Sequence, residues 1–320
     1  MSLSKSILAC IAALCMSATA AAQYPEKPVR IVVPFAPGGA VDTIARIVAD
    51  KISGPLGQSV YVENRTGAGS MVGTEAVVRA APDGYTLLLG TASALLINPL
   101  LQDLPYDPMK DLAPVAEVGV VPYLLVANPG IPATDLRSFI AYAKAHPGKL
   151  SYASAGAGTP HHIAGEMFKQ MAGIDMVHVP YRGSGPALID LVSGQVGVMT
   201  VEILAALPYV QSGKLRALGI ATGQRSPLAP DIPTAAQAGL PGFEFTAWYG
   251  VVAPAGVPGD VIDRLSRVIN QAMAEPDARQ RLAAVGVTPQ GGTPAQFAAL
   301  MKSEGLKWRK AVKDANVRLQ

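Results

Sequence analysis

The sequence contains very little cysteine. Its only two cysteines, Cys10 and Cys15, lie close to the N-terminus within an apolar stretch. That stretch, from Ile7 to Met16, follows Lys5 and precedes a run of small residues from Ala18 to Ala22. This order of a basic residue, a short apolar run and small residues is typical of a cleavable secretory signal peptide, which we predict for residues 1–22.

Cleavage of this segment after Ala20 or Ala22 leaves a mature chain without a thiol group. Such a chain forms neither disulfides nor cysteine metal sites, and it suits the oxidising periplasm, where we expect the mature protein. Lipid anchoring is not favoured, because Cys10 lies too early in the segment and Cys15 follows the bulky Leu14.

The sequence also lacks a strong excess of charge and a second long apolar run. It has 26 Lys and Arg against 23 Asp and Glu, a formal net charge of +3, which argues against a nucleic-acid partner. Although 50% of its residues are hydrophobic, glycine or proline interrupts each later apolar run before about 18 residues, so we expect a soluble mature chain. A length of 320 residues favours two medium-sized α/β domains.

The sequence does contain a repeated strand, loop and helix pattern. An apolar strand at Val29 to Pro34 leads through small residues into a helix with apolar residues at helical spacing. We expect Gly54 and Pro55 to end that helix, and Thr134 to cap a later helix. Further expected features are a helix beginning at Pro160 with Ala164, Met167, Phe168 and Met171 facing inward, glycine ends at Gly173 and Gly194, and a capping box formed by Thr293 and Gln296.

Strands that alternate with helices predict parallel, doubly wound, Rossmann-like sheets with ligands beyond the carboxyl ends of the strands. The pattern restarts near Pro122, and the chain returns near Phe245. We therefore predict two α/β lobes joined by two crossovers, with lobe 1 at residues 23–122 plus 246–320 and lobe 2 at residues 123–245. The two lobes would face one cleft.

Four predicted loops share one design, in which small residues lie between a strand end and a helix start. They are Pro37–Ala40, Gly67–Ser70, Gly156–Thr159 and Gly183–Gly185. Each offers backbone N–H groups at the positive end of a helix dipole, and several of them in one cleft would bind carboxylate oxygens. For each loop alone, the interpretation as an ordinary tight turn stays open.

Other chemistries find less support in the sequence. The glycines of residues 67–73 resemble a dinucleotide loop, but the next strand ends in Gly90 and Thr91 instead of a ribose-binding acid. His161 and His162 would point about 100° apart on a helix, so they cannot share one small metal ion. No phosphate-binding P-loop and no G-x-S-x-G nucleophile elbow is present. We expect no cofactor, no metal and no catalysis.

A set of short segments, taken together, resembles one known family. These segments are Val32 to Gly39 with Asp42, Glu63 to Gly69, Pro82 to Thr86, Gly158 to His161, Val179 to Gly183, Gly213 to Leu218, Pro233 with Thr234, Trp248 to Gly250, and Ala253 to Gly256. Along its mature length the chain is similar to the Bug-type periplasmic receptors of the tripartite tricarboxylate transporter family. The resemblance implies a type 2 periplasmic-binding-protein fold that closes on a carboxylated ligand and delivers it to a permease of one large and one small subunit.

One position departs from the family pattern. Many members carry an Asp near the end of the strand that here reads Val198 to Glu202, and Val201 stands at that place. If the Asp supports a ligand amino group in relatives, its loss favours a plain mono- or polycarboxylate. Glu202 is the alternative group that could compensate.

We predict that the ligand is bound by the strand-end loops and their neighbours. The predicted residues are Phe35, Gly38, Gly39, Ala68, Gly69, Thr91, Ser93, Ser154, Gly158, Thr159, His161, Arg182, Thr200 and Glu202. Arg182 either pairs with the anion or is a solvated loop residue. Trp248 and Tyr249 are expected to pack at the seam between the lobes, with stacking on the ligand as the less favoured alternative.

The predicted function is capture of a di- or tricarboxylate, or of an aromatic or other organic acid, for transport by a monomeric receptor. A ligand sensor for a receptor kinase is the alternative, and a periplasmic enzyme ranks last.

Overall fold

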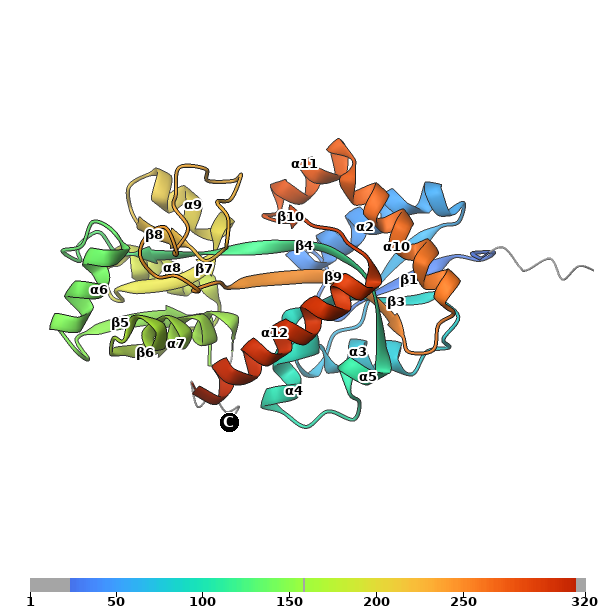
Figure 1. The fold of residues 1–320 in the computed structure, drawn as a ribbon, viewed down its shortest axis with the longest axis horizontal. Helices are drawn as coiled ribbons and strands as arrows, with labels where there is room; N and C mark the ends of the chain where they lie inside the picture. The colour runs from blue at the N-terminus through green and yellow to red at the C-terminus, as the bar shows by residue number, and fades with distance from the viewer. Residues whose placement is uncertain (1–23, 158, 315–320) are drawn as a thin grey trace, which may run out of the picture.

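The structure, a computed structural model, describes residues 24–157 and 159–314. The predicted signal peptide therefore lies outside the described residues, as does Gly158. The described chain forms two α/β lobes that lie side by side and are joined by two long strands, as Figure 1 shows. The two-lobed α/β fold predicted from the alternating pattern is confirmed. No helix within the described ranges is long and apolar enough to cross a membrane.

The first lobe has helices on both faces of its strands. Side chains of β1 alternate between two apolar clusters, with Ile31 and Val33 in one and Val32 in the other, so both faces of the strand are buried. The elements before the first crossover are β1 (Val29–Val33), α2 (Ala40–Leu56), β2 (Val60–Asn64), η1 (Ala68–Ser70), α3 (Met71–Val78), β3 (Thr86–Thr91), the π-helical turn η2 (Ser93–Ile97), α4 (Asn98–Leu101) and α5 (Pro108–Asp111).

The second lobe lies between the two crossover strands in sequence. Its elements are α6 (Leu136–Ala145), β5 (Leu150–Ser154), α7 (Pro160–Ala172), β6 (Met176–Pro180), α8 (Ser184–Ser193), β7 (Val198–Glu202), α9 (Ile203–Gln211) and β8 (Arg216–Ile220). The crossover strands are β4 (Leu112–Ala127) and β9 (Thr246–Pro254), and α10 (Gly259–Ala274), α11 (Pro276–Ala284), β10 (Thr288–Pro289) and α12 (Pro294–Asp314) follow them.

One continuous sheet runs through both lobes in the order β2-β1-β3-β9-β4-β7-β5-β6. The pairs of β1 with β2 and β3, and of β5 with β6 and β7, are parallel as predicted. The prediction of parallel strands was wrong for β4, β8 and β9, which run antiparallel to their neighbours. The reason is that β4 leaves the first lobe and β9 returns to it, so these adjacent strands run in opposite directions.

The crossover strands separate where the sequence indicates a change of lobe. Pro122 on β4 lies opposite Thr246 on β9, at the end of the register between these strands. From Tyr123 onward β4 pairs with β7 instead. The lobe boundaries 122/123 and 245/246, which stay a prediction, fall at this pair.

Several helix ends follow the sequence signals. Gly173 and Gly194 end α7 and α8 in the left-handed conformation, with φ of 61° and 82°. At the start of α12, the Thr293 amide donates to the Gln296 side chain and the Gln296 amide donates to the Thr293 hydroxyl. The predicted capping box is therefore confirmed.

Three local predictions were wrong. Helix α2 does not stop at Gly54 and Pro55 but continues to Leu56, because Gly57 supplies the left-handed residue that ends it, with φ of 71°. Asp135 caps α6 in place of Thr134, since its carboxylate accepts from the Ser138 amide. Met171 is 37% exposed, because the inward face of α7 is made by other residues, among them Ala164 and Phe168.

Helix α12 lies across the crossover strands and contacts elements of both lobes, η2 and α7 (Figure 1). The ring of Phe297 meets that of Trp248 edge to face, with centroids 5.4 Å apart. Gly250 makes room for this contact, since a Cβ there would lie 2.2 Å from the Phe297 ring. Trp248 therefore packs at the seam, as predicted.

Candidate functional site

A cleft of about 230 Å³ lies between the lobes, beside the crossover strands. Both lobes, both crossover strands and α12 contribute to it. Its lining residues are Phe35, Val41, Thr91, Ala92, Ser93, Ile97, Tyr123, Ala155, Thr159, Pro160, His161, Glu202, Phe245, Thr246, Ala247, Tyr249 and Trp308. Six of the residues predicted from the sequence are among them: Phe35, Thr91, Ser93, Thr159, His161 and Glu202.

The polar centre of this cleft is the carboxylate of Glu202. Glu202 ends β7 and lies opposite Tyr123 of β4, whose hydroxyl donates to Glu202 Oε1 at 3.0 Å. His161, in the first turn of α7, places Nε2 3.0 Å from Glu202 Oε2. Because a carboxylate only accepts hydrogen bonds, the nitrogen that faces it carries the proton. Three elements thus converge on one carboxylate.

The surroundings keep Glu202 ionised. Burial raises the pKa of its carboxyl, but the hydrogen bond and charge of His161, with the Tyr123 hydroxyl, lower that pKa to a net value below the usual range. Burial and the charge of Glu202 raise the pKa of Tyr123 well above its ordinary value. Burial, followed by the same charge, raises the pKa of Tyr249 to about 12. Both phenols therefore remain protonated donors at neutral pH.

Aromatic side chains form much of the remaining wall. Tyr123 meets Phe245 edge to face with centroids 5.0 Å apart, and Phe245 meets Trp308 in the same way at 4.9 Å. Phe35 and Tyr249 add two further rings. Lysine and arginine are absent from the lining contributed by the described residues.

Apart from Phe35, the aromatic wall is the part of the site that the sequence predictions missed. Tyr249 was expected to pack at the seam together with Trp248, but only Trp248 does so. Successive residues of a strand point to opposite faces, so Trp248 meets α12 while Tyr249 lines the cleft. That alternation was a usable signal for Tyr249, whereas nothing in the local sequence pointed to Trp308.

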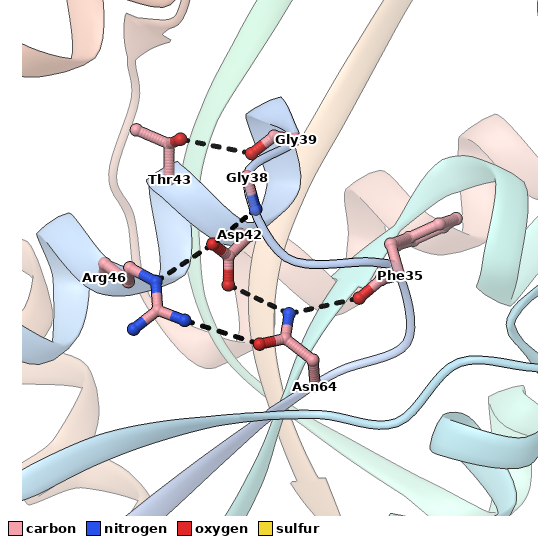
Figure 2. Close-up of polar contacts among 7 residues, drawn as sticks. All are labelled: Phe35, Gly38, Gly39, Asp42, Thr43, Arg46 and Asn64. Carbon is pink, nitrogen blue, oxygen red and sulfur yellow. Dashed lines mark hydrogen bonds and ion pairs between the residues drawn. The ribbon is translucent and has the colours of Figure 1, made fainter.

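A network behind the first strand-end loop fixes one wall of the cleft (Figure 2). Asp42 Oδ2 accepts from the Gly38 amide at 3.0 Å and from Arg46 Nε at 2.9 Å, and Oδ1 accepts from Asn64 Nδ2 at 2.9 Å. The same Asn64 nitrogen donates to the Phe35 carbonyl at 3.1 Å. The network therefore ties the backbone of Phe35 to β2 and α2.

The carboxylate of Asp42 accepts a hydrogen bond from the backbone amide of Gly38, a residue that was predicted from the sequence to bind the ligand. Burial raises its pKa, but the hydrogen bonds from Arg46, Gly38 and Asn64 lower it to about 2. Asp42 therefore stays ionised and holds the Gly38 N–H within the protein. Gly38 and Gly39 are exposed and are not among the described residues that line the cleft.

A second network lies behind the loop that begins α7. Ser154 is fully buried, and its hydroxyl contacts the Gly156 carbonyl at 3.0 Å and His178 Nε2 at 2.7 Å. The Thr159 hydroxyl donates to the same Gly156 carbonyl at 2.7 Å. Ser154 thus supports the loop that carries Thr159 and does not itself line the cleft within the described chain.

The remaining predicted residues lie elsewhere. Ala68 and Arg182 are exposed, and neither belongs to the described lining. Thr200 is 2% exposed, and its hydroxyl has no hydrogen-bond partner among the described residues. Gly158 lies outside the described residues. The binding roles assigned to these residues stay predictions.

The end of β7 also shows which side of the strand serves the cleft. Val201 is fully buried in the apolar core of the second lobe. Glu202, the next residue, points to the other face and lines the cleft. In this structure the carboxylate of the cleft is therefore supplied by Glu202.

Comparisons with known proteins place the chain in one family. A family model described as "Tripartite tricarboxylate transporter family receptor" matches residues 44–317. The protein BugT of Bordetella pertussis is 39% identical over 299 residues, which cover 93% of this chain and 92% of BugT.

Three solved structures with the same fold are also similar in sequence. The periplasmic binding protein BugD is 35% identical with a TM-score of 0.72, and the match covers 92% of this chain and 100% of BugD. A protein of R. palustris, solved with adipate, is 33% identical with a TM-score of 0.74 over 92% of this chain and 100% of that one. MatC from Rhodopseudomonas palustris, with bound malate, is 37% identical with a TM-score of 0.71 over 90% of this chain and 100% of MatC.

Proposed function

The chain belongs to the tripartite tricarboxylate transporter receptor family, and on this basis we propose that it traps a small carboxylate between its lobes and delivers it to the permease subunits of such a transporter. It is a periplasmic solute-binding receptor, like its relatives. The observation that supports trapping most directly is the origin of the cleft lining, which comes from both lobes and both crossover strands. A ligand bound there would contact both lobes and so favour their closed arrangement.

Hydroxyl groups and a helix start would hold the carboxylate. Thr91 ends β3 and Ser93 begins η2 in the first lobe, and these two residues supply the hydroxyl groups. In the second lobe Thr159, whose hydroxyl donates to the Gly156 carbonyl, precedes the start of α7. Helix α7 begins with Pro160 at its first position, and its N-terminus lies at the cleft. The backbone N–H groups of the first turn after Pro160, and the positive end of the helix dipole, therefore face the cleft. Adipate and malate, bound by two relatives, are acids of the size that the cleft admits.

The glycine loops belong to the same proposal. Gly38, Gly39, Ala68 and Gly69 follow the carboxyl ends of β1 and β2, the edge at which doubly wound sheets bind ligands. Closure of the lobes would bring this edge onto a ligand that already contacts the second lobe. We propose no catalysis, because the relatives are binding proteins, and we expect a monomer.

A screen of organic acids tests the proposal. Thermal unfolding of the purified protein is followed with and without a panel that includes adipate, malate, citrate and substituted benzoates, and hits are titrated by calorimetry. At a concentration of 100 Kd, a true ligand adds about 2.7 kcal/mol to the free energy of unfolding. A protein that no carboxylate stabilises would contradict the proposal, and so would turnover of a bound acid. Uptake of the identified acid by cells with and without the permease genes tests delivery.

A further inference from the structure

The cleft presents one carboxylate and no lysine or arginine among its described lining residues. The side chain of Glu202 is 34% exposed, so its carboxylate is open to the cleft on one side. Tyr123 and His161 occupy one acceptor site on each oxygen, and an ionised carboxylate offers about four such sites. The free sites of Glu202 can therefore accept further hydrogen bonds from a ligand.

The carboxylate of Glu202 favours some ligand groups over others at its position in the cleft. A second ligand carboxylate near Glu202 would meet a like charge, with no lysine or arginine of the described lining to compensate it. A hydroxyl or amino group at the same place would donate to the carboxylate in a charge-assisted hydrogen bond. The charge of His161, which lowers the pKa of the Glu202 carboxyl, offsets part of this repulsion. Its Nε2 proton faces Glu202, however, and leaves the remaining acceptor sites of the carboxylate open to a ligand donor.

The remaining wall selects for shape. The cleft lining includes five aromatic side chains, of which Phe35 and Tyr249 are partly exposed, while Tyr123, Phe245 and Trp308 are buried against one another and border the cleft. A flat, rigid ring packs against such surfaces and loses little conformational entropy on binding, whereas a flexible chain loses more. The volume of about 230 Å³ lies below the range of about 300–1,000 Å³ that is usual for drug-sized ligands, so one small ring is the size that fits.

We infer that the cleft is selective for an aromatic monocarboxylate that carries a hydrogen-bond donor, a hydroxyl or amino group, at the end away from its carboxylate. Glu202 is the residue that recognises the donor and disfavours dicarboxylates. This inference rests on the proposed function, since it names the class of acid that the same cleft binds.

Calorimetry of the protein purified after export tests the inference with five probes: 3-hydroxybenzoate, 4-hydroxybenzoate, benzoate, terephthalate and adipate. We expect one of the hydroxybenzoates to bind at least about tenfold more tightly than benzoate, the value of one charge-assisted hydrogen bond, and both dicarboxylates to bind more weakly than benzoate. Tighter binding of adipate or terephthalate would overturn the inference and leave the proposed trap intact. If none of these and no other carboxylate binds, the proposed function itself fails.

The variant Glu202→Gln separates the role of the charge from that of shape. The hydroxyl advantage over benzoate should fall to about threefold or less, and terephthalate should gain at least about tenfold relative to the wild-type protein. Glu244→Gln is the matched control, because Glu244 is exposed and lies outside the described cleft lining while the change of charge is the same. An unchanged order of affinities in Glu202→Gln, in a variant whose melting temperature shows that it is folded, would overturn the role of Glu202.

Discussion

The imidazole rings of His162 and His178 stack face to face, with centroids 3.9 Å apart and planes within 5° of parallel. His162 belongs to α7 and His178 to the neighbouring strand β6. The ring of Tyr152 of β5 stacks on that of His178 with centroids 4.9 Å apart and lies 6.4 Å from that of His162. Burial first, and then the nearby His162, lower the pKa of His178 to about 4, and burial lowers the pKa of His162 as well. Both rings are therefore neutral at pH 7.

We predict that this stack destabilises the protein in acid. In the unfolded chain His178 binds a proton near its ordinary pKa of about 6.5, whereas the folded protein takes it up only near pH 4. The contribution of the neutral His178 ring to the free energy of unfolding is therefore complete above pH 6.5. About 1 to 3 kcal/mol of that free energy is lost as the pH falls to 4. Urea unfolding at pH 7.5 and pH 4.5 measures this loss.

The fall in the free energy of unfolding between pH 7.5 and pH 4.5 should be smaller in His178→Gln by about 1 to 3 kcal/mol, because the variant has no imidazole to titrate at this position. Glu166 and Lys169 also act on His178, with opposite effects on its pKa, so neither is altered in the comparison. His146→Gln is the matched control, since His146 is exposed at the end of α6. An equal loss in the wild-type protein and in His178→Gln would contradict the prediction.

A second prediction concerns Asp42, the centre of the network in Figure 2. Asp42→Asn should lower the free energy of unfolding at pH 7 by about 1 to 3 kcal/mol, because the buried carboxylate accepts charge-assisted bonds from three groups. The folded pKa of about 2 lies below the unfolded one. This stabilisation is therefore present above pH 4 and is lost as the pH falls toward 2.

Asp50→Asn is the control for this change. Asp50 is in the same helix, but its side chain is 64% exposed in a pair with Arg281, so its loss should cost no more than about 1 kcal/mol. Chemical unfolding at pH 7 and at pH 3 compares the two variants. The prediction fails if both variants lose the same stability at pH 7, or if the cost of Asp42→Asn does not shrink in acid.

Much of the fold could be read from the sequence because short strands end at glycine loops. The apolar strand Val29–Val33 and the helix after Gly39 were recognisable in this way. The long strand β4 was not, because it contains Pro114 and Pro122, and proline usually marks the end or edge of a strand. In the structure the register of β4 with β9 shifts just after Pro114, and their pairing ends at Pro122, so both prolines lie where the ladder is interrupted.

The site could be predicted only in part, because some of its residues follow a local sequence pattern and others do not. Thr159, His161 and Glu202 lie at strand ends or helix starts, where a sequence pattern directs attention. Phe245 and Trp308 come from a loop end and from the C-terminal helix, and they meet the cleft only because α12 crosses both lobes. Such a contact depends on tertiary packing, which no local pattern contains.

A third prediction concerns Glu117 of β4. Burial and the charge of Glu304 raise the pKa of the Glu117 carboxyl to about 7. The unfolded carboxyl ionises near pH 4.5, so the free energy of unfolding is highest in mild acid and falls as the pH rises through 7. Glu117→Gln removes this loss. We expect the variant to be more stable than the wild type by about 1 to 3 kcal/mol at pH 8.5 and equal within about 0.5 kcal/mol at pH 4.

Thermal and chemical unfolding at these two pH values measure the difference. Glu244→Gln, which changes an exposed carboxylate, should show the same stability relative to wild type at both. A Glu117→Gln variant whose advantage does not grow with pH would mean that Glu117 is ionised in the folded protein well below pH 7.

The last prediction uses the two tryptophans of the chain, Trp248 and Trp308. Trp308 lines the cleft, and its indole nitrogen has no hydrogen-bond partner within the described part of the chain. Trp248 is equally buried but packs on Phe297 and is absent from the described lining. A ligand in the cleft would therefore change the surroundings of Trp308 and leave those of Trp248 nearly constant.

Binding of an acid that calorimetry identifies should change the tryptophan emission of the wild-type protein and of Trp248→Phe. It should leave the emission of Trp308→Phe almost unchanged. Calorimetry on each variant separates loss of signal from loss of binding, and the melting temperature checks folding, because Trp248→Phe removes part of a buried ring and should cost about 1 to 3 kcal/mol. A full emission change in Trp308→Phe, together with normal binding, would place the ligand away from this cleft, because the only remaining indole lies against Phe297.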